Sequence, residues 1–385
     1  MNAAERARGA SAAESNAVLH VDSGKEWRGG QAQALELLRG LRGLGVAQRL
    51  ACPPGSPLEA RARSEGFEIA PIPMSGEWDL LAPRRIAYAA REMGATLLHA
   101  HDSRAHGLCW RALGRLFRAR LVVTRRVDFA IGGNWLSRRK YGDRRTHYIA
   151  ISNGVREVLI QGGVAPERVE VVPSGINLSR FTGRYSRADL LAEFGLPPET
   201  FVIGNIAALT DHKGQCYLID AAPLVLRECP RARFFIVGEG ELRGALERRI
   251  AGKALQGNVF LTGYRQDVEK FLAGFDLFVL PSHLEGLCTS LLDAQSFGVA
   301  AVATRVGGAP DVVEDGRNGL LVEARDPAAL AEAILRLWRD EPLRRRFGEE
   351  GRRIVQERFT AEAMVAGTAA VYRKVAAVVQ PGAPI

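Results

Sequence analysis

Short apolar runs alternate with amphipathic stretches along almost the whole chain. In the first half, the apolar runs occupy residues 17–21, 96–100, 121–124 and 147–151, and an amphipathic stretch at 31–44 follows the first run. Short apolar runs predict buried strands, and amphipathic stretches predict helices with one buried face. Strands and helices in this alternation predict a parallel sheet with helices on both faces.

The same pattern restarts after residue 200. Its apolar runs are residues 201–209, 233–238, 258–263, 275–281 and 299–304. Two such series in one chain of 385 residues predict two doubly wound α/β domains. The boundary is expected where a predicted strand ends in Pro, Ser and Gly, within residues 171–181.

This pattern divides the chain into four parts. They are a disordered tail at residues 1–16, a first domain over 17–178, a second domain over 179–359, and a last helix with a tail over 360–385. The first residues are small and polar and lack the apolar core of a secretory signal, which predicts a cytoplasmic protein. No run of about 18 or more apolar residues occurs, so the sequence predicts no transmembrane helix.

The cysteines of the chain do not form a paired pattern. The five are Cys52, Cys109, Cys216, Cys229 and Cys288. None belongs to a Cys-x-x-Cys pair and their number is odd, so a disulfide framework or a zinc site is not expected. Reduced thiols in a cytosolic protein fit this pattern better.

Positive charge is concentrated in the first half of the chain. Residues 1–180 hold 27 Lys and Arg against 17 Asp and Glu, whereas the remainder holds 25 against 26. The first half should therefore face an anionic partner, either a phosphorylated acceptor, a membrane surface or a nucleic acid.

The segment from 104 to 145 carries much of this charge and interleaves it with aromatic residues. Its members include Arg111, Arg115, Arg118, Arg120, Arg125, Arg126, Arg138, Arg139 and Lys140, with Trp110, Phe117, Phe129, Trp135 and Tyr141 between them. A solvated helix face would account for many of these charges. We expect instead that Arg125, Arg126, Arg138, Arg139 and Lys140 contact an anionic glycolipid acceptor or the membrane surface. No nucleic-acid motif accompanies the charge, so no nucleic-acid partner is expected.

The segment SHLEGLCTSLLDAQSFGVAAVATRVGGAPDVV, residues 282–313, is the most informative for chemistry. Glu285 follows an apolar strand, and a helix is predicted from Leu287 to Phe297. The start of this helix offers free backbone N–H groups for an anion, at Leu287, Cys288, Thr289 and Ser290. Glu285 and Asp293 could each accept hydrogen bonds from hydroxyls of one ligand, one from a hexose and the other from a ribose. The alternative is that Glu285 complements the helix dipole and Asp293 is solvated.

Two further loops between a strand and a helix are candidates for binding phosphate. In NIAALTDHKGQ, residues 205–215, Lys213 is placed to meet a diphosphate, although a surface lysine is the common alternative. In GKEWRGGQAQAL, residues 24–35, Gly29 and Gly30 would let a phosphate or sugar approach the backbone, and a plain tight turn is the alternative. The glycine spacing in residues 238–244 does not fit a dinucleotide site.

Taken together in this order, these segments resemble family 4 of the retaining glycosyltransferases, which have the GT-B fold. The resemblance extends over nearly the whole chain after residue 16. It rests on ISNGVREVLIQGGVAPERVEVVPSGIN at 151–177, VGEGELRGALE, the Lys-Gly of HKG, and the run from Glu285 to Asp293. It implies two Rossmann-like domains facing a central cleft, with a nucleotide-sugar donor on the second domain and the acceptor on the first.

The resemblance also implies roles for particular residues. Glu285 would contact the donor sugar, Lys213 the diphosphate and His101 the transferred sugar, while Asp293 stands where a glutamate binds ribose. The loop of Gly263, Tyr264 and Arg265 would contact the base. An arginine is often found five positions before the lysine, but Ala208 stands there in this chain. No cluster of Asp, Glu and His at metal-ligand spacing is visible, so neither a catalytic metal nor a cofactor is expected.

The expected function is therefore transfer of a sugar from a nucleotide-sugar, with UDP favoured, to a glycan or glycolipid acceptor. Synthesis of lipopolysaccharide or another cell-envelope glycan fits this activity, with the protein in the cytoplasm or peripheral on the membrane. Two alternatives stay open at this point. One is a nucleotide-sugar epimerase or a phosphorylase on the same fold, because a fold does not determine its function. The other is a noncatalytic protein that binds sugar or nucleic acid.

Overall fold

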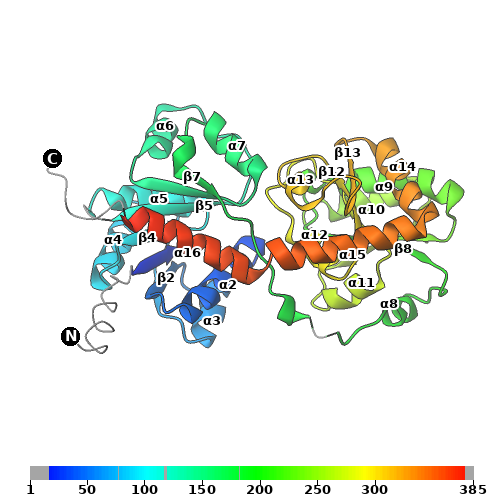
Figure 1. The fold of residues 1–385 in the computed structure, drawn as a ribbon, viewed down its shortest axis with the longest axis horizontal. Coiled ribbons are helices and arrows are strands. Elements are labelled where there is room, and N and C mark those ends of the chain that lie inside the picture. The colour runs from blue at the N-terminus through cyan, green and yellow to red at the C-terminus, as the bar shows by residue number, and fades with distance from the viewer. Residues whose placement is uncertain (1–16, 77, 117–118, 182, 378–385) are drawn as a thin grey trace, which may run out of the picture.

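The computed structural model describes residues 17–76, 78–116, 119–181 and 183–377. The tail expected at residues 1–16 and two members of the basic segment, Phe117 and Arg118, lie outside these ranges. The described chain forms two parallel β-sheets with helices around each, which confirms the predicted fold class (Figure 1). No helix in these ranges is both long and apolar enough to cross a membrane.

The first sheet has seven parallel strands in the order β3-β2-β1-β4-β5-β6-β7. The strands are β1 (Val18–Val21), β2 (Gln48–Cys52), β3 (Ile69–Pro71), β4 (Leu97–Ala100), β5 (Arg120–Arg125), β6 (Thr146–Ala150) and β7 (Val169–Val171). The helices are α2 (Gly29–Gly43), α3 (Pro57–Ser64), α4 (Ala82–Glu92), α5 (Ser103–Leu113), α6 (Trp135–Gly142) and α7 (Asn153–Gln161). The strand order reverses between β1 and β4, where both strands are buried throughout.

The second sheet has six strands in the order β10-β9-β8-β11-β12-β13. The strands are β8 (Phe201–Ile206), β9 (Ala232–Val237), β10 (Val259–Gly263), β11 (Leu277–Leu280), β12 (Ala300–Thr304) and β13 (Gly319–Val322). The helices are α8 (Arg187–Glu193), α9 (Gln215–Glu228), α10 (Arg243–Gly252), α11 (Val268–Gly274), α12 (Thr289–Ser296), α13 (Ala309–Val312), α14 (Pro327–Arg339) and α15 (Glu341–Arg358). Its order reverses between β8 and β11, and ligands of such sheets bind beyond the carboxyl ends of the strands at this point.

The last helix, α16 (Ala361–Ala377), continues the line of α15 and packs on α2 of the first domain (Figure 1). The entry to α16 is fixed to the link between the domains, because Ile176 N donates to Phe359 O at 2.9 Å and Ala361 N donates to Ile176 O at 3.0 Å. A Cβ on Gly40 of α2 would lie 2.2 Å from Val365 Cγ2, so glycine at this position allows the two helices to approach closely. The C-terminal helix thereby ties the two sheets together beside the cleft that separates them.

Candidate active site

A cleft of about 1100 Å³ lies between the two domains, and loops from both of them line it. On the first-domain side the lining residues follow β1, β4 and β5, and include Gly29, Gly30, His101, Arg125 and Arg126. On the second-domain side they follow β8, β9, β10 and β11, and include Ala208, Lys213, Tyr264, Arg265 and Glu285. The structure therefore brings half of the predicted site residues, nine of eighteen, to one cavity at the strand ends where open parallel sheets bind ligands.

An ion pair between Lys213 and Glu285 lies in this cleft. Lys213 Nζ is 2.6 Å from Glu285 Oε2, and the two side chains are only 18% and 6% exposed. Ser282 Oγ donates a hydrogen bond to the same carboxylate oxygen at 3.3 Å. Burial alone would lower the pKa of Lys213, but the charge and hydrogen bond of Glu285, together with other nearby groups, outweigh burial and raise that pKa. Lys213 is therefore protonated at neutral pH, with a carboxylate as its counter-ion.

The backbone around Lys213 explains how the lysine reaches the cleft. Lys213 ends the 3-10 helix η3 (Asp211–Lys213), and Gly214 turns the chain into α9 with a φ of 66°. A Cβ on Gly214 would lie 2.1 Å from the carbonyl oxygen of Pro281, at the end of the neighbouring strand β11. Glycine is therefore required both for the left-handed turn and for the close approach of the two loops.

The loop that carries Glu285 is held by the first domain. Asp128, in the loop after β5, accepts a hydrogen bond from the Glu285 backbone N–H at 3.0 Å. A Cβ on the next residue, Gly286, would lie 2.1 Å from the carbonyl oxygen of Arg126. On the other side, Gly308 N donates to Glu285 O at 3.0 Å. The sequence analysis did not identify Asp128, although its position just beyond a strand end is the signal that could have found it.

Asp293 lies elsewhere, on the buried part of α12. Its carboxylate pairs with the guanidinium of Arg180 in the link between the domains, and it does not line the cleft. Burial raises the pKa of Asp293, and Arg180 opposes that shift. Its expected contact with ribose therefore stays a prediction. For that contact to form, Asp293 would have to release Arg180, or accept a hydrogen bond from the ribose hydroxyl while still paired with Arg180.

The helix start proposed as an anion site is largely buried. Helix α12 begins at Thr289 rather than Leu287, and Leu287 and Cys288 are buried. Ser290 Oγ donates to the carbonyl of Ile206 at 2.5 Å. None of these residues lines the cleft, so their role in binding an anion stays a prediction.

The other predicted binding loops are more open. A Cβ on Gly29 would meet no atom within 4 Å, so the start of α2 leaves space for a ligand. Tyr264 is 69% exposed at the rim of the cleft. Arg265 is bound by two carboxylates, Glu193 at 2.9 Å and Asp267 at 2.7 Å. Gly263, the first residue of this loop, has a φ of 77°.

His101 lies on the first-domain wall within a group of three buried imidazoles. His101 Nε2 is 3.0 Å from His20 Nδ1, and the Nδ1 of His101 has no partner. His99 completes the group, with its two nitrogens bonded to Thr124 at 2.7 Å and to Tyr372 at 2.5 Å. Burial lowers the pKa of all three, that of His20 to about 3, so they are uncharged.

These three nitrogens lie within 4.8 Å of one another and could geometrically hold a metal ion. The sequence analysis missed the group because its members come from two strands that are adjacent only in the sheet. Both nitrogens of His99 are already hydrogen-bonded, to Thr124 and to Tyr372, whereas His20 Nε2 and His101 Nδ1 have no partner. A metal held by all three imidazoles would therefore have to displace one of the hydrogen bonds of His99.

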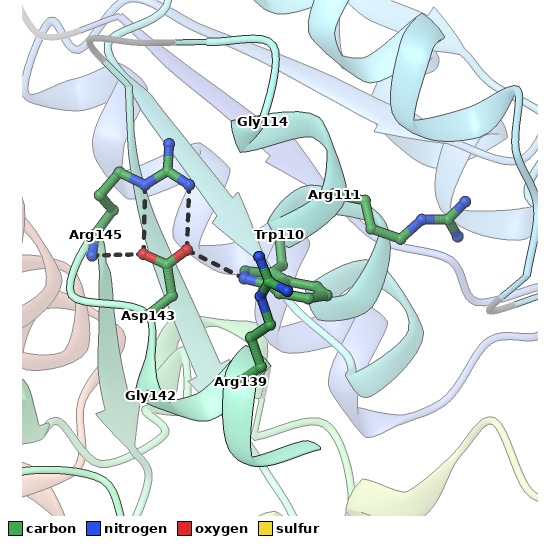
Figure 2. Close-up of a pocket in the computed structure, with 7 residues that line it drawn as sticks. All are labelled: Trp110, Arg111, Gly114, Arg139, Gly142, Asp143 and Arg145. Carbon is green, nitrogen blue, oxygen red and sulfur yellow. Dashed lines mark hydrogen bonds and ion pairs between the residues drawn. The ribbon is translucent and has the colours of Figure 1, made fainter. Parts of the chain in front are cut away.

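The basic segment divides between two places in the first domain. Arg125 and Arg126 reach the cleft, whereas Arg138, Arg139 and Lys140 lie on α6. Arg139 lines a second pocket of about 590 Å³ with Trp110, Arg111 and Arg145 (Figure 2). In that pocket Arg145 is bound to Asp143, and Arg111 points away from this pair.

Comparison with known proteins is consistent with this geometry. The family described as Glycosyltransferase Family 4 matches residues 27–180, and the family described as Glycosyl transferases group 1 matches residues 198–340. The chain is 28% identical over 263 residues to the UDP-Gal:alpha-D-GlcNAc-diphosphoundecaprenol alpha-1,3-galactosyltransferase of Escherichia coli, covering 64% of this chain and 67% of that protein.

Solved structures share the fold over nearly the whole chain. A glycosyltransferase from Rickettsia africae superimposes with a TM-score of 0.83 at 18% identity, covering 94% of this chain and 99% of that one. Anabaena Alr3699/HepE, in complex with UDP and glucose, superimposes with a TM-score of 0.80 at 20% identity, covering 92% and 99%. The chain therefore belongs to the group 1, family 4 glycosyltransferases with the GT-B fold.

Proposed function

We propose that this glycosyltransferase moves a hexose from a UDP-sugar to a glycan or glycolipid acceptor, with retention of configuration and without a catalytic metal. The observation that carries the proposal is the buried pair of Lys213 and Glu285 in the cleft between the domains. The UDP donor is supported by the name of the Escherichia coli relative and by the UDP complex of the Anabaena protein. Retention is supported by the family resemblance of the sequence.

The pair can exchange its partners when the donor binds. An arriving diphosphate would replace the Glu285 carboxylate as the counter-ion of Lys213. The protonated lysine would then stabilise the negative charge that develops on the leaving diphosphate, without a metal. Glu285 would then be free to accept a hydrogen bond from a sugar hydroxyl. The open backbone at Gly29 and Gly30, at the start of α2, adds further N–H donors for the phosphates.

The acceptor is proposed to enter from the first domain. That wall carries His101 and Arg125, and Glu285 lines the same cleft. Closure of the two walls would exclude water from the donor. The proton of the acceptor hydroxyl would pass to the leaving phosphate oxygen, so the proposal requires no protein base.

An anionic glycolipid of the cell envelope is the proposed acceptor class, reached by peripheral contact with the membrane. The acceptor in the name of the Escherichia coli relative is itself a sugar on a diphosphoundecaprenol. In this chain Trp135 is 71% exposed at the start of α6, and Arg138, Arg139 and Lys140 follow it on the same helix. Basic and aromatic side chains together suit the surface of an anionic membrane.

Replacing the charged pair tests the proposed site. Lys213→Ala should lower turnover of the donor by an order of magnitude or more, since a preorganised charge is lost. Glu285→Gln should lower transfer more than it weakens binding of free UDP, because its proposed partner is the sugar. Turnover is measured as UDP release, with circular dichroism as a control for folding. Near-normal turnover in both variants would show that the pair is only structural.

The contact between Asp128 and the Glu285 backbone gives a matched comparison. Asp128→Asn keeps an oxygen that can accept this hydrogen bond, whereas Asp128→Ala removes it. We expect kcat to fall about tenfold or more in the alanine variant, because a slightly misplaced catalytic group is costly. The asparagine variant should keep most of the activity. Equal loss in the two would mean that the charge of Asp128 matters and not its hold on Glu285.

Salt dependence tests the proposed membrane contact. Vesicles with anionic lipid should retain the protein at low salt and release it at high salt, because the Debye length falls from about 10 Å at 0.1 M to about 3 Å at 1 M. Combined replacement of Arg138, Arg139 and Lys140 by Ala should weaken retention and spare UDP binding. Equal retention by neutral and anionic vesicles would contradict the membrane contact and leave a soluble phosphorylated acceptor to account for the charge.

A further inference from the structure

The proposed diphosphate site lacks an arginine at Ala208, which lines the cleft five positions before Lys213. Any second cation for the donor must therefore come from another residue of the cleft. The described cleft-lining residues that carry a permanent positive charge are Arg28, Arg125, Arg126, Lys213 and Arg265. Burial lowers the pKa of His212, so this nearby imidazole is uncharged at neutral pH.

Three of these five cations already have a carboxylate partner. Arg28 is 2.6 Å from Glu26 and largely exposed, Arg265 is bound by two carboxylates, and Lys213 is paired with Glu285. Within the described part of the chain, Arg125 and Arg126 have no carboxylate at ion-pair distance, and their side-chain partners are the neutral groups of Tyr141, Phe129 and Ser174. The second cation should be one of these two.

Arg125 is anchored in the wall by neutral acceptors. Its side chain is 9% exposed, and its guanidinium donates to Tyr141 OH at 2.9 Å and to the carbonyl of Phe129. These contacts hold both terminal nitrogens against the protein. Arg125 therefore has little capacity left to bind a diphosphate.

Arg126 is less constrained. Its Nη1 donates to Ser174 Oγ at 3.2 Å, and its buried Nε has no hydrogen-bond partner. Burial lowers the pKa of Arg126 to about 10, with Asp22 opposing, so the side chain remains charged at neutral pH. The oxygen of Asp22 accepts from Gly24 N at 2.8 Å and from Gln31 at 3.0 Å, and it forms no ion pair with Arg126.

The position of Arg126 places it between the proposed phosphate-binding elements. Its Cδ would be 3.7 Å from a Cβ on Gly30, in the first turn of α2. Its own carbonyl oxygen would be 2.1 Å from a Cβ on Gly286, the residue after Glu285. A charged guanidinium that is partly withdrawn from water and has no carboxylate at ion-pair distance gains most when an anion arrives.

We propose that Arg126 binds the donor diphosphate from the first domain and supplies the positive charge that Ala208 does not. The inference rests on the proposed function, since it assumes that Lys213 binds the same diphosphate. Because Lys213 belongs to the second domain and Arg126 to the first, a diphosphate that binds both would draw the two domains together. This assignment differs from the role in acceptor binding that the sequence alone predicted for Arg126.

The decisive experiment moves the charge from one wall to the other. The affinities of UDP and UMP are measured by titration calorimetry for the parent, Arg126→Ala, Ala208→Arg, and the double variant Arg126→Ala with Ala208→Arg. Arg126→Ala should weaken UDP binding by about tenfold to a hundredfold, as for loss of a hydrogen bond to a charged group, and weaken UMP binding less. Ala208→Arg should restore most of the lost UDP affinity in the double variant.

Two controls separate this inference from the proposed function. Arg156→Ala removes a first-domain arginine outside the cleft and should leave UDP affinity unchanged, while Lys213→Ala should weaken it. Loss in Lys213→Ala with none in Arg126→Ala would overturn the inference and leave the proposed function standing. No loss in either would contradict both.

The same variants also test whether Arg126 binds the acceptor instead of the donor. Release of UDP from the donor by hydrolysis, with no acceptor present, should fall in Arg126→Ala. If this hydrolysis and UDP affinity match the parent while transfer to the acceptor falls, Arg126 binds the acceptor and the inference is wrong. Arg126→Lys, which keeps the charge, should retain more UDP affinity than the alanine variant and shows whether charge is the property that matters.

Discussion

The buried ion pair between Lys213 and Glu285 is the interaction on which the site depends. Its two members follow β8 and β11, which are neighbours in the second sheet, with Leu277 paired to Ile203. This strand order places the two loops together, and Gly214 leaves room for their close approach. Removing one partner of a buried ion pair leaves an uncompensated charge, at a cost of about 3–5 kcal/mol. A diphosphate that takes the place of the carboxylate avoids this cost, because the lysine exchanges one anion for another.

The rest of the molecule holds this pair at the boundary between the domains. On the first-domain side, Asp128 accepts a hydrogen bond from the backbone N–H of Glu285. The backbone of Arg126 contacts the same loop at Gly286, where a side chain would clash with it. The last helix, α16, returns to the first domain and packs on α2. The proposed donor site therefore draws on both domains, which is a physical reason for placing the proposed reaction in the cleft that they share.

Sequence patterns predicted the two parallel sheets because their central strands are apolar at consecutive positions. They missed β2, β3 and β13, which are short and only partly buried, with half-buried Gln48 at the start of β2 and exposed Pro71 at the end of β3. For the site, the loops after strands directed attention to Lys213 and Glu285, and both line the cleft because strand ends converge there. The contacts of Asp293 with Arg180, and of Asp128 with Glu285, join residues more than 100 positions apart, and local patterns contain no signal for such pairings.

The most direct test of a transferase at this cleft is the release of nucleoside diphosphate from a panel of nucleotide-sugars, with and without EDTA and with isolated envelope glycolipids as acceptors. The account predicts UDP from one UDP-sugar, in amounts that match the glycosylated acceptor and that EDTA does not change. Conversion of the donor to another sugar without released UDP would indicate an epimerase, and binding of donors with neither outcome would indicate a noncatalytic binding protein. Either result would contradict the account.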